Sequence, residues 1–200
     1  MTRLSLDDFY RDQPDLAPSM RKEVNFDHPR AIDWRLAEAV LLGCRAGRSV
    51  YAPRYSFVTH TRRRTFKMVV PRPIILVDGL WLLWRPGLRR LFDLRIFLHC
   101  PARLRLDRRL ARDVAKRGRD GRSVRQQYQK TVAPMHERFV APQARWADLV
   151  VRQPLGQAEV ERIGVIIKAT VCSVTRAVLR RRKRLHAPRL YAIRAVSVPG

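Results

Sequence analysis

The chain has 200 residues, the size of one domain, and 46% of them are hydrophobic. That content supports a packed core and excludes wholesale disorder. Lys and Arg number 42 against 17 Asp and Glu, leaving a net charge of +25, which excludes a mainly acidic surface and favours anionic partners. Only six of the basic residues are Lys, an imbalance that genomic base composition also produces, so charge alone does not identify a nucleic-acid-binding protein.

Cysteine and histidine are few and dispersed. Three cysteines are an odd count that suits neither a disulfide framework nor a zinc site, and we expect a reducing, cytoplasmic setting. No segment reaches the apolar length of a membrane span. We therefore expect no membrane partner.

Strand and helix patterns alternate from the start of the chain. A short strand is expected at residues 3–6, and apolar spacing predicts a helix from 32 to about 45. Residues 50–58 and 65–70 indicate a two-stranded arm, joined by a basic turn at 61–64.

The alternation continues through the second half. Continuous apolar runs predict buried strands at 74–77 and 94–98. The remaining expected elements are helices at 101–116 and 123–140, a strand at 147–151 and a closing helix at 158–179. This order predicts an α/β fold with a mainly parallel sheet.

Two aspartates follow predicted strands. Asp7 comes after the strand at 3–6, and Asp78 comes after the strand at 74–77. Ligands of open parallel sheets bind beyond the carboxyl ends of the strands. A carboxylate there can accept a proton from an attacking hydroxyl or hold Mg²⁺, and it can equally be a turn residue.

The predicted helix at 101–116 and the break after it are rich in arginine. Guanidinium groups three or four positions apart gather near one face, where they suit phosphate oxygens. The alternative is a solvated face on which Asp107 and Asp113 pair with arginines of the same helix. Gly118 would give a lid its flexible corner. The arginines are Arg105, Arg108, Arg109, Arg112, Arg117 and Arg119.

Several short motifs follow one another in a fixed order. They are Asp7-Asp8-Phe9-Tyr10, Asn25-Phe26-Asp27-His28-Pro29, Tyr55-Ser56-Phe57-Val58-Thr59-His60-Thr61-Arg62, Asp78-Gly79, Arg117-Gly118-Arg119-Asp120, and Pro134-Met135-His136 with Ala147-Asp148. In order and spacing they resemble uridine-cytidine kinase, of the phosphoribulokinase/uridine kinase family of P-loop kinases, over residues 1 to about 152. The resemblance implies a mainly parallel sheet flanked by helices, with a small β-arm.

The resemblance also implies an activity, transfer of phosphate from ATP or GTP, with Mg²⁺, to uridine or cytidine in pyrimidine salvage. By this likeness Asp7 is the catalytic base that takes the proton of the nucleoside 5′-hydroxyl, and Asp27 holds the ribose hydroxyls. Tyr55, Phe57 and His60 match the arm that holds the pyrimidine ring.

The lid residues carry over in the same way. Arg109, Arg119 and Gln127 match contacts on the nucleoside side, and Arg112 and Arg117 match lid arginines over the ATP phosphates. Asp78 matches the metal ligand, although the family usually has Glu there. Ser56 stands where the family usually has Asp, which weakens the match of the base pocket. Tetramers are usual in the family, so the resemblance implies a homo-oligomer.

The largest departure is the missing phosphate loop. No GxxxxGK[ST] motif occurs in the 200 residues, and Met1 falls just before the family's second strand. In the resembled fold the missing first strand lies between the strand ending at Asp78 and the strand at 94–98. We expect a start codon assigned too late or a truncated product, with impaired ATP binding. The chain could close the gap in the sheet by pairing 74–77 with 94–98, or fill it with residues 190–198, the one spare strand outside the matched region. Because residues 174–200 carry eight basic groups and no acid, which opposes burial, we expect a defective sheet instead.

The expected organisation is a kinase-like domain at 1–152, a closing helix at 153–173 and a poorly ordered basic tail at 174–200. Two other functions stay open. One is a pseudokinase that binds nucleoside without catalysis. The other is an arginine-rich nucleic-acid-binding protein, which ranks last because the chain has no known nucleic-acid motif and no interleaving of aromatic and basic residues.

Overall fold

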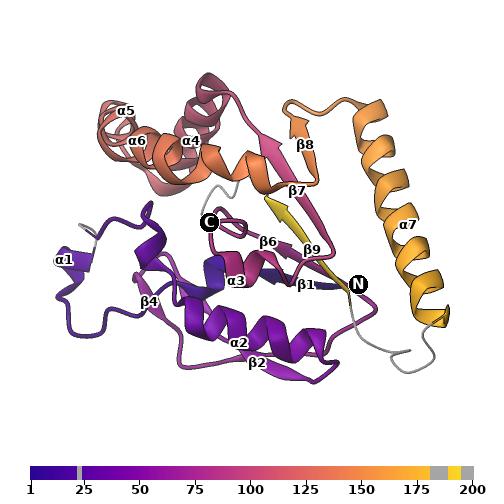
Figure 1. Ribbon diagram of the computed structural model, residues 1–200. Helices are drawn as coiled ribbons and strands as arrows, with labels where there is room; N and C mark the ends of the chain where they lie inside the picture. Colours follow the sequence, from indigo (N-terminus) through magenta and orange to yellow (C-terminus); the bar gives the residue numbers. More distant parts are fainter. Residues whose placement is uncertain (22–23, 181–188, 195–200) are drawn as a thin grey trace.

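The computed structural model describes residues 1–21, 24–180 and 189–194 (Figure 1). Its centre is a five-stranded sheet with the order β1-β6-β9-β7-β8, in which every neighbouring pair is parallel. The strands are β1 (Thr2–Ser5), β6 (Ile74–Asp78), β9 (Arg189–Arg194), β7 (Leu94–His99) and β8 (Leu149–Arg152). The predicted α/β class and parallel sheet are confirmed.

Strand β9 lies between β6 and β7, where the sequence analysis expected a gap. Leu190 pairs with Ile75, and Tyr191 pairs with Leu94. The expectation of a defective sheet is therefore wrong. Each edge left open would keep buried backbone amides unpaired, at about 1 to 3 kcal/mol each, and one short apolar segment of the tail satisfies both edges. The tail residues 181–188 and 195–200 lie outside the described residues.

Asp93 fixes the entry of β9 into the sheet. The Leu190 amide donates to Asp93 Oδ2 at 3.0 Å, and the Asp93 amide donates to the Leu190 carbonyl at 2.8 Å. Arg45 donates to the same carboxylate at 3.3 Å. These contacts tie the strand to the end of α2 (Trp34–Arg45) and to the start of β7.

Helices cover both faces of the sheet. On one face α2, capped by the Asp33 side chain at the Leu36 amide, packs in the larger core, which includes Leu190. On the other face α7 (Gln157–Arg180) places Ile163 and Ile166 against a second cluster that includes Tyr191. Within the described residues no helix is long and apolar enough to cross a membrane.

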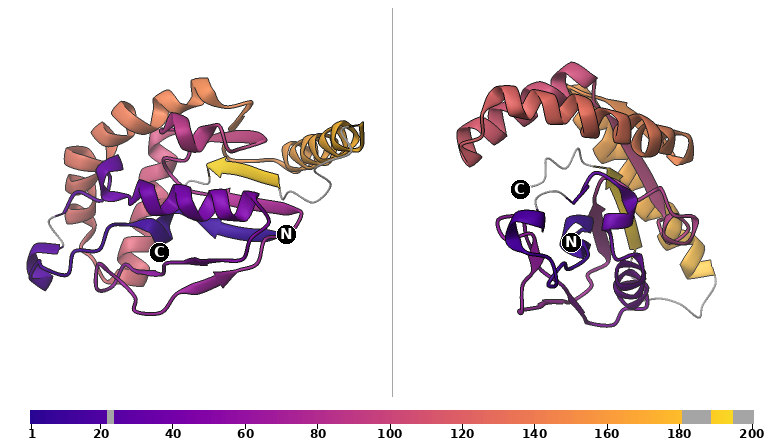
Figure 2. Two further views of the ribbon diagram at one scale, coloured as in Figure 1. Left: turned by 60° about the horizontal axis from the view of Figure 1, so that its bottom comes forward. Right: turned by 90° about the vertical axis from the view of Figure 1, so that its left-hand side faces the viewer.

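After β7 the chain forms a layer of helices apart from α2 (Figure 2). The α4 helix ends at Gly118, whose φ of 60° is a left-handed conformation that glycine adopts without strain. The segments of this layer, called the lid below, are α4 (Ala102–Arg117), α5 (Gly121–Gln127), η3 (Tyr128–Val132), α6 (Ala133–Met135), η4 (His136–Val140) and η5 (Ala141–Trp146).

The predicted arm is present but is split into two short hairpins. Strands β2 (Val50–Ala52) and β5 (Lys67–Val69) form one, and β3 (Tyr55–Ser56) and β4 (Thr61–Arg62) form the other. The turn lies at residues 57–60 rather than at the basic run 61–64, because Thr61 and Arg62 already pair with β3. The remaining short helices are η1 (Leu6–Phe9), α1 (Pro18–Arg21), η2 (Pro29–Ala31) and α3 (Pro86–Arg89).

Leu190→Ala should destabilise the chain by about 2 to 5 kcal/mol, because it opens a cavity under the central strand, where Leu190 is fully buried. Val150→Ala on strand β8 is the control, because the Val150 side chain is 45% exposed and should change stability by about 0.5 kcal/mol or less. Thermal or urea unfolding measures both. Equal stability of the two variants would show that β9 is not part of the core.

Candidate functional site

Two carboxylates mark the carboxyl edge of the sheet. Asp7 lies in η1, directly after β1, and its amide donates to Ser5 Oγ at 3.4 Å. Asp78 ends β6 and is the register partner of Ser5. Parallel pairing of β1 with β6 therefore brings the two sequence-predicted acids to one edge.

Asp78 is a buried carboxylate with both oxygens engaged. Arg3 Nε donates to Asp78 Oδ2 at 2.9 Å, and Ser5 Oγ donates to Asp78 Oδ1 at 2.9 Å. Across the described part of the chain, no three His, Cys, Asp or Glu side chains gather as a metal site. Mg²⁺ binds carboxylates that are free to face it, so this arrangement does not fit the ion that the resemblance implies, and no step below is routed through a metal.

Tyr10 lies within electrostatic range of both Asp7 and Asp27. Its hydroxyl donates to the Phe26 carbonyl at 3.3 Å. Burial raises the Tyr10 pKa well above its usual value, and the charges of Asp7 and Asp27 raise it further. Both carboxylates are therefore close enough to act on one phenol, although they are 20 positions apart in sequence.

An aromatic cluster stands beside these acids. The His60 ring stacks on Phe26 with centroids 4.9 Å apart and planes 18° apart. Tyr55 contacts Phe57 and Tyr10, each with ring centroids at 5.2 Å. The structure thus brings together the three arm residues that the sequence singled out, and adds Phe26 and Tyr10.

Tyr55 also presents a polar group to this cluster. Its hydroxyl is buried, and no hydrogen-bond partner for it lies among the described residues. Burial raises the Tyr55 pKa to about 12, so the hydroxyl stays protonated at neutral pH and is available as a donor.

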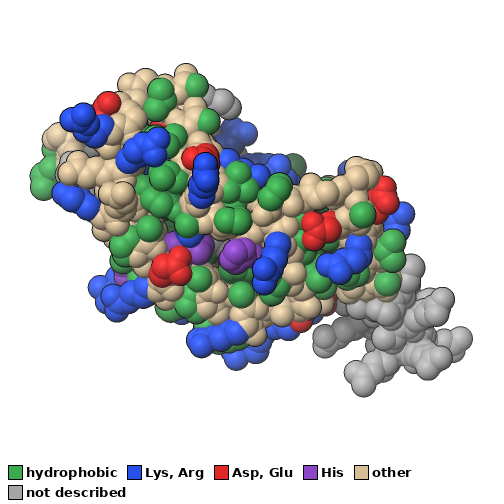
Figure 3. All heavy atoms as spheres, turned by 90° about the horizontal axis from the view of Figure 1, so that it is seen from above, with side chains coloured by type: hydrophobic (Ala, Val, Ile, Leu, Met, Phe, Trp, Pro, Cys, Tyr) green, Lys and Arg blue, Asp and Glu red, His purple; other side chains and the backbone are tan. Residues whose placement is uncertain are grey.

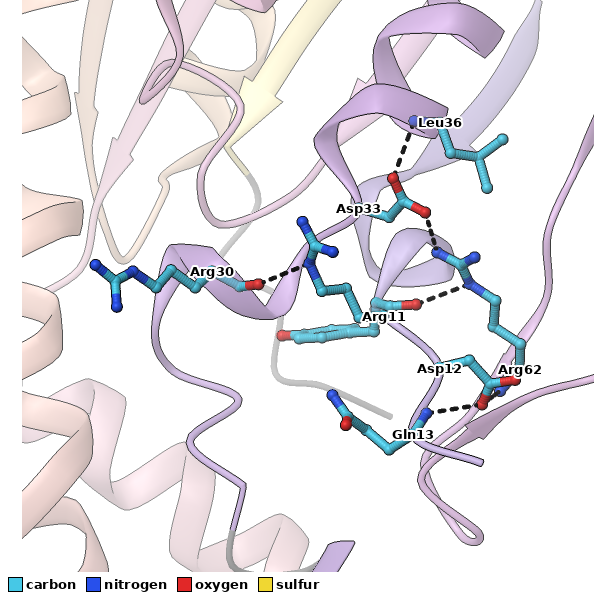
Figure 4. A network of polar contacts seen from close by, with 8 residues as sticks. Arg11, Asp12, Gln13, Arg30, Asp33, Leu36 and Arg62 are labelled. Atoms are coloured by element: carbon cyan, nitrogen blue, oxygen red, sulfur yellow. Dashed lines mark hydrogen bonds and ion pairs between the residues drawn. The ribbon is translucent and has the colours of Figure 1, made fainter. Parts of the chain in front are cut away.

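Arg62 fastens the arm to the rest of the site. Its guanidinium donates to Asp33 Oδ2 at 3.0 Å and to the Tyr10 carbonyl at 2.9 Å, and its amide donates to Asp12 Oδ1 at 3.0 Å. Figure 4 shows these contacts converging from β4, the start of α2 and the segment after η1. The Arg62 side chain, at the base of the β3–β4 hairpin, therefore sets the position of the hairpin.

The lid faces Asp27. Burial raises the Asp27 pKa, and Arg109 and Arg112 partly oppose that rise. Burial lowers the Arg109 pKa, with Asp27 and Asp113 opposing. Asp27 thus lies within electrostatic range of two arginines of α4.

Gln127 joins the two lid arginines that the sequence assigned to the nucleoside side. Arg109 Nη2 donates to Gln127 Oε1 at 3.2 Å, and Arg119 Nη1 donates to the same oxygen at 2.9 Å. The three residues come from α4, the corner at Gly118 and α5. The side chain of Arg117, also predicted here, lies outside the described side chains.

Asp113 has a larger role than the residue pattern predicts, because it lies among three arginines. Its carboxylate is fully buried, accepts from Arg112 Nε at 2.7 Å, and lies 3.6 Å from Arg109 Nε and 3.7 Å from Arg119 Nη1. The pairing with arginines of its own helix was anticipated. The reach to Arg119 was not, because it depends on the turn that the chain makes at Gly118.

Residues 2–160 match the phosphoribulokinase/uridine kinase family. The chain belongs to this family. Among its relatives, the uridine kinase of Shewanella amazonensis is 42% identical over 145 residues, covering 72% of this chain and 68% of the relative. The uridine kinase of Chloroflexus aurantiacus is 40% identical over 169 residues, covering 82% and 81%.

The fold is that of the P-loop kinases. Phosphoribulokinase from Rhodobacter spheroides superposes with a TM-score of 0.58 at 14% identity, over 75% of this chain and 59% of that one. At this identity the likeness concerns the fold alone. The family resemblance inferred from the motifs is confirmed.

Asp113→Asn should destabilise the chain by about 3 kcal/mol or more, because three guanidinium groups would lose the buried charge between them. Asp107→Asn is the control, since Asp107 is an exposed acid of the same helix. Thermal unfolding of both variants at low salt measures the difference. Matching transitions would contradict the role given to Asp113.

Asp27→Asn should raise the melting temperature at neutral pH. Folding raises the Asp27 pKa, so the wild-type protein loses stability as pH rises through that pKa and the carboxyl ionises. The side-chain amide of the variant does not ionise, so the variant keeps its stability. The advantage of the variant should vanish below the ordinary aspartate pKa of 3.8.

Asp33→Asn is the matched control with the opposite sign. Burial acts to raise the Asp33 pKa, but hydrogen bonds from the Leu36 amide and Arg62 outweigh it, and the pKa is lowered. This variant should lose stability at neutral pH and approach the wild type in acid. Parallel pH profiles for the two variants would refute the assignment.

Proposed function

We propose that this chain is a nucleoside kinase of the uridine kinase type, which transfers a phosphoryl group from ATP or GTP to the 5′-hydroxyl of uridine or cytidine. One observation carries the proposal. Asp7, the stacked Phe26–His60 pair and the lid arginines, which are far apart in sequence, converge around Tyr10 and Asp27.

The arrangement gives each group a chemical task. Asp7, at the sheet edge, takes the proton of the attacking hydroxyl. Asp27 accepts hydrogen bonds from the ribose hydroxyls, with Arg109 and Gln127 beside it. His60, Phe57 and the Tyr55 hydroxyl receive the pyrimidine, since stacking on aromatic rings contributes about 1 to 3 kcal/mol per base.

The lid supplies the positive charge that phosphoryl transfer requires. Arg112 donates one N–H to Asp113 at 2.7 Å, and we assign it, together with Arg117, to the phosphate oxygens. Asp78 matches the metal ligand of the family pattern, but its contacts with Arg3 and Ser5 do not fit that task, and the proposal gives it no metal to hold.

A second candidate function is nucleoside binding without phosphoryl transfer. It is favoured by the engaged Asp78 carboxylate. An arginine-rich nucleic-acid-binding protein has less support. On the face shown in Figure 3, Lys and Arg side chains are scattered among hydrophobic ones rather than gathered in a strip.

His60→Ala should weaken uridine binding about tenfold, because it removes one stacking face. His99→Ala is the control, since His99 is an exposed histidine at the end of β7. Calorimetric titration with uridine measures both variants. Equal uridine affinities of the two folded variants would show that the pyrimidine ring does not bind at the arm.

Turnover is measured separately, with ATP, Mg²⁺ and uridine. Asp7→Asn should lower kcat by about 10² to 10⁴ while KM changes little, because a general base acts on the chemical step. Asp15→Asn, an exposed aspartate nearby in sequence, should leave both unchanged. Uridine binding without turnover in the wild type would favour the second function, and absence of both would refute the proposal.

A further inference from the structure

A cavity of about 620 Å³, open to solvent and called the second cavity below, lies beside the candidate site. It is lined by residues of η2, the start of α2, the segment before α3, η4 and Arg11. None of the eleven side chains predicted from the sequence lines it. Its volume is in the range of small-molecule sites.

Four arginines contribute to its wall: Arg11, Arg30, Arg85 and Arg138. All four are exposed. Within the described residues, none of them has a carboxylate within 4 Å, although most arginines of the site above are paired with acids. Guanidinium groups gathered without acids repel one another, and an anion between them removes that repulsion.

The arginines are held by local contacts. Arg11 Nε donates to the Arg30 carbonyl at 3.1 Å, and Figure 4 shows the Arg30 guanidinium extending away from this bond. Arg30 and Arg138 both act on His28, where burial and their two charges lower the His28 pKa. Arg30 and Arg138 therefore approach one histidine from different segments of the chain.

The remaining wall is aromatic. Trp84 and His28 both contact Phe139, with ring centroids at 5.2 and 4.7 Å. Arg85 lies over the Trp34 ring at 5.7 Å, and the Trp34 indole is fixed by donation to the Pro29 carbonyl at 2.9 Å. The wall thus offers ring faces and edges next to cations, which suits a planar ring that carries negative charge.

We propose that this cavity binds a free nucleoside diphosphate, with its base against Trp84 and Phe139 and its phosphates among Arg30, Arg138, Arg11 and Arg85. Four cations match a polyphosphate better than a single carboxylate or monophosphate. The volume of about 620 Å³ is that of a small-molecule site, so a mononucleotide fits it better than a strand of nucleic acid. This site is separate from the one under Proposed function and does not depend on it.

The test is calorimetric titration of the full chain with ADP, adenosine and inorganic diphosphate. ADP should bind more tightly than either part. Arg30→Gln combined with Arg138→Gln should weaken ADP binding about tenfold or more. Arg103→Gln combined with Arg162→Gln removes the same charge from exposed positions away from the cavity and should change ADP affinity less than about twofold.

Several outcomes would overturn the proposal. Equal losses of ADP affinity in the two double variants would show a non-specific effect of charge. Inorganic diphosphate that binds as tightly as ADP would show that the aromatic wall does not bind the base. ADP binding that Arg112→Gln weakens and the cavity variant does not would place ADP beside α4, which contradicts this site and leaves the proposed function standing. A short single-stranded RNA that binds more tightly than ADP, with the same dependence on Arg30 and Arg138, would show that the cavity binds nucleic acid and not a free nucleotide.

Hydrogen exchange of the unaltered chain gives a result that does not depend on variant folding. ADP should slow exchange in peptides that cover residues 83–90 and 136–142, on two sides of the cavity. Peptides that cover 50–62 of the arm should not change. Protection confined to the arm or to residues 102–120 would refute the site.

Discussion

The structure depends on one constraint, which is that β6 and β7 must each find a hydrogen-bonding neighbour on the sides that face each other. Strand β9 meets it for both. Once the sheet is continuous, the carboxyl ends of all its strands share one edge, which places Asp7 and Asp78 together and sends the chain from β7 into the lid. The candidate site is thus assembled on an edge that the last described strand completes.

Acidic residues are scarce in this chain, and several of those present lie where separate segments meet. Asp113 draws together arginines of α4 and of the corner at Gly118. Asp33 holds Arg62 of the arm, and Asp93 holds Arg45 and the start of β9. In a protein of net charge +25, each such carboxylate removes repulsion and joins two segments at once. The arginines around the second cavity differ in having no such partner among the described residues.

Much of the fold could be predicted from the sequence because its signals are local. Apolar runs gave the strands at 74–77 and 94–98, and motif order gave the family. The sequence indicated residues 190–198 as a spare strand but did not decide that they enter the sheet, because strand pairing depends on which edges are open elsewhere, and the eight basic residues of the tail argued against burial. In the sheet, Leu190 and Tyr191 of this segment are buried on opposite faces. The candidate site, too, could be predicted only in part. Residue types at Asp7, Asp27 and His60 were visible, whereas the coupling through Tyr10 and Asp113 exists only after the chain has folded.

The position of β9 also bears on how the protein is made. The amide of its second residue, Leu190, bonds to a carboxylate 97 positions earlier, so the halves of the sheet on either side of β9 are synthesised well before the strand that joins them. On the ribosome, β6 and β7 emerge with open edges and wait for residues 189–194 to leave the exit tunnel. Unpaired edges of this kind recruit strands of other molecules. The nascent chain, rather than the finished protein, is therefore the species most exposed to aggregation and most in need of a chaperone.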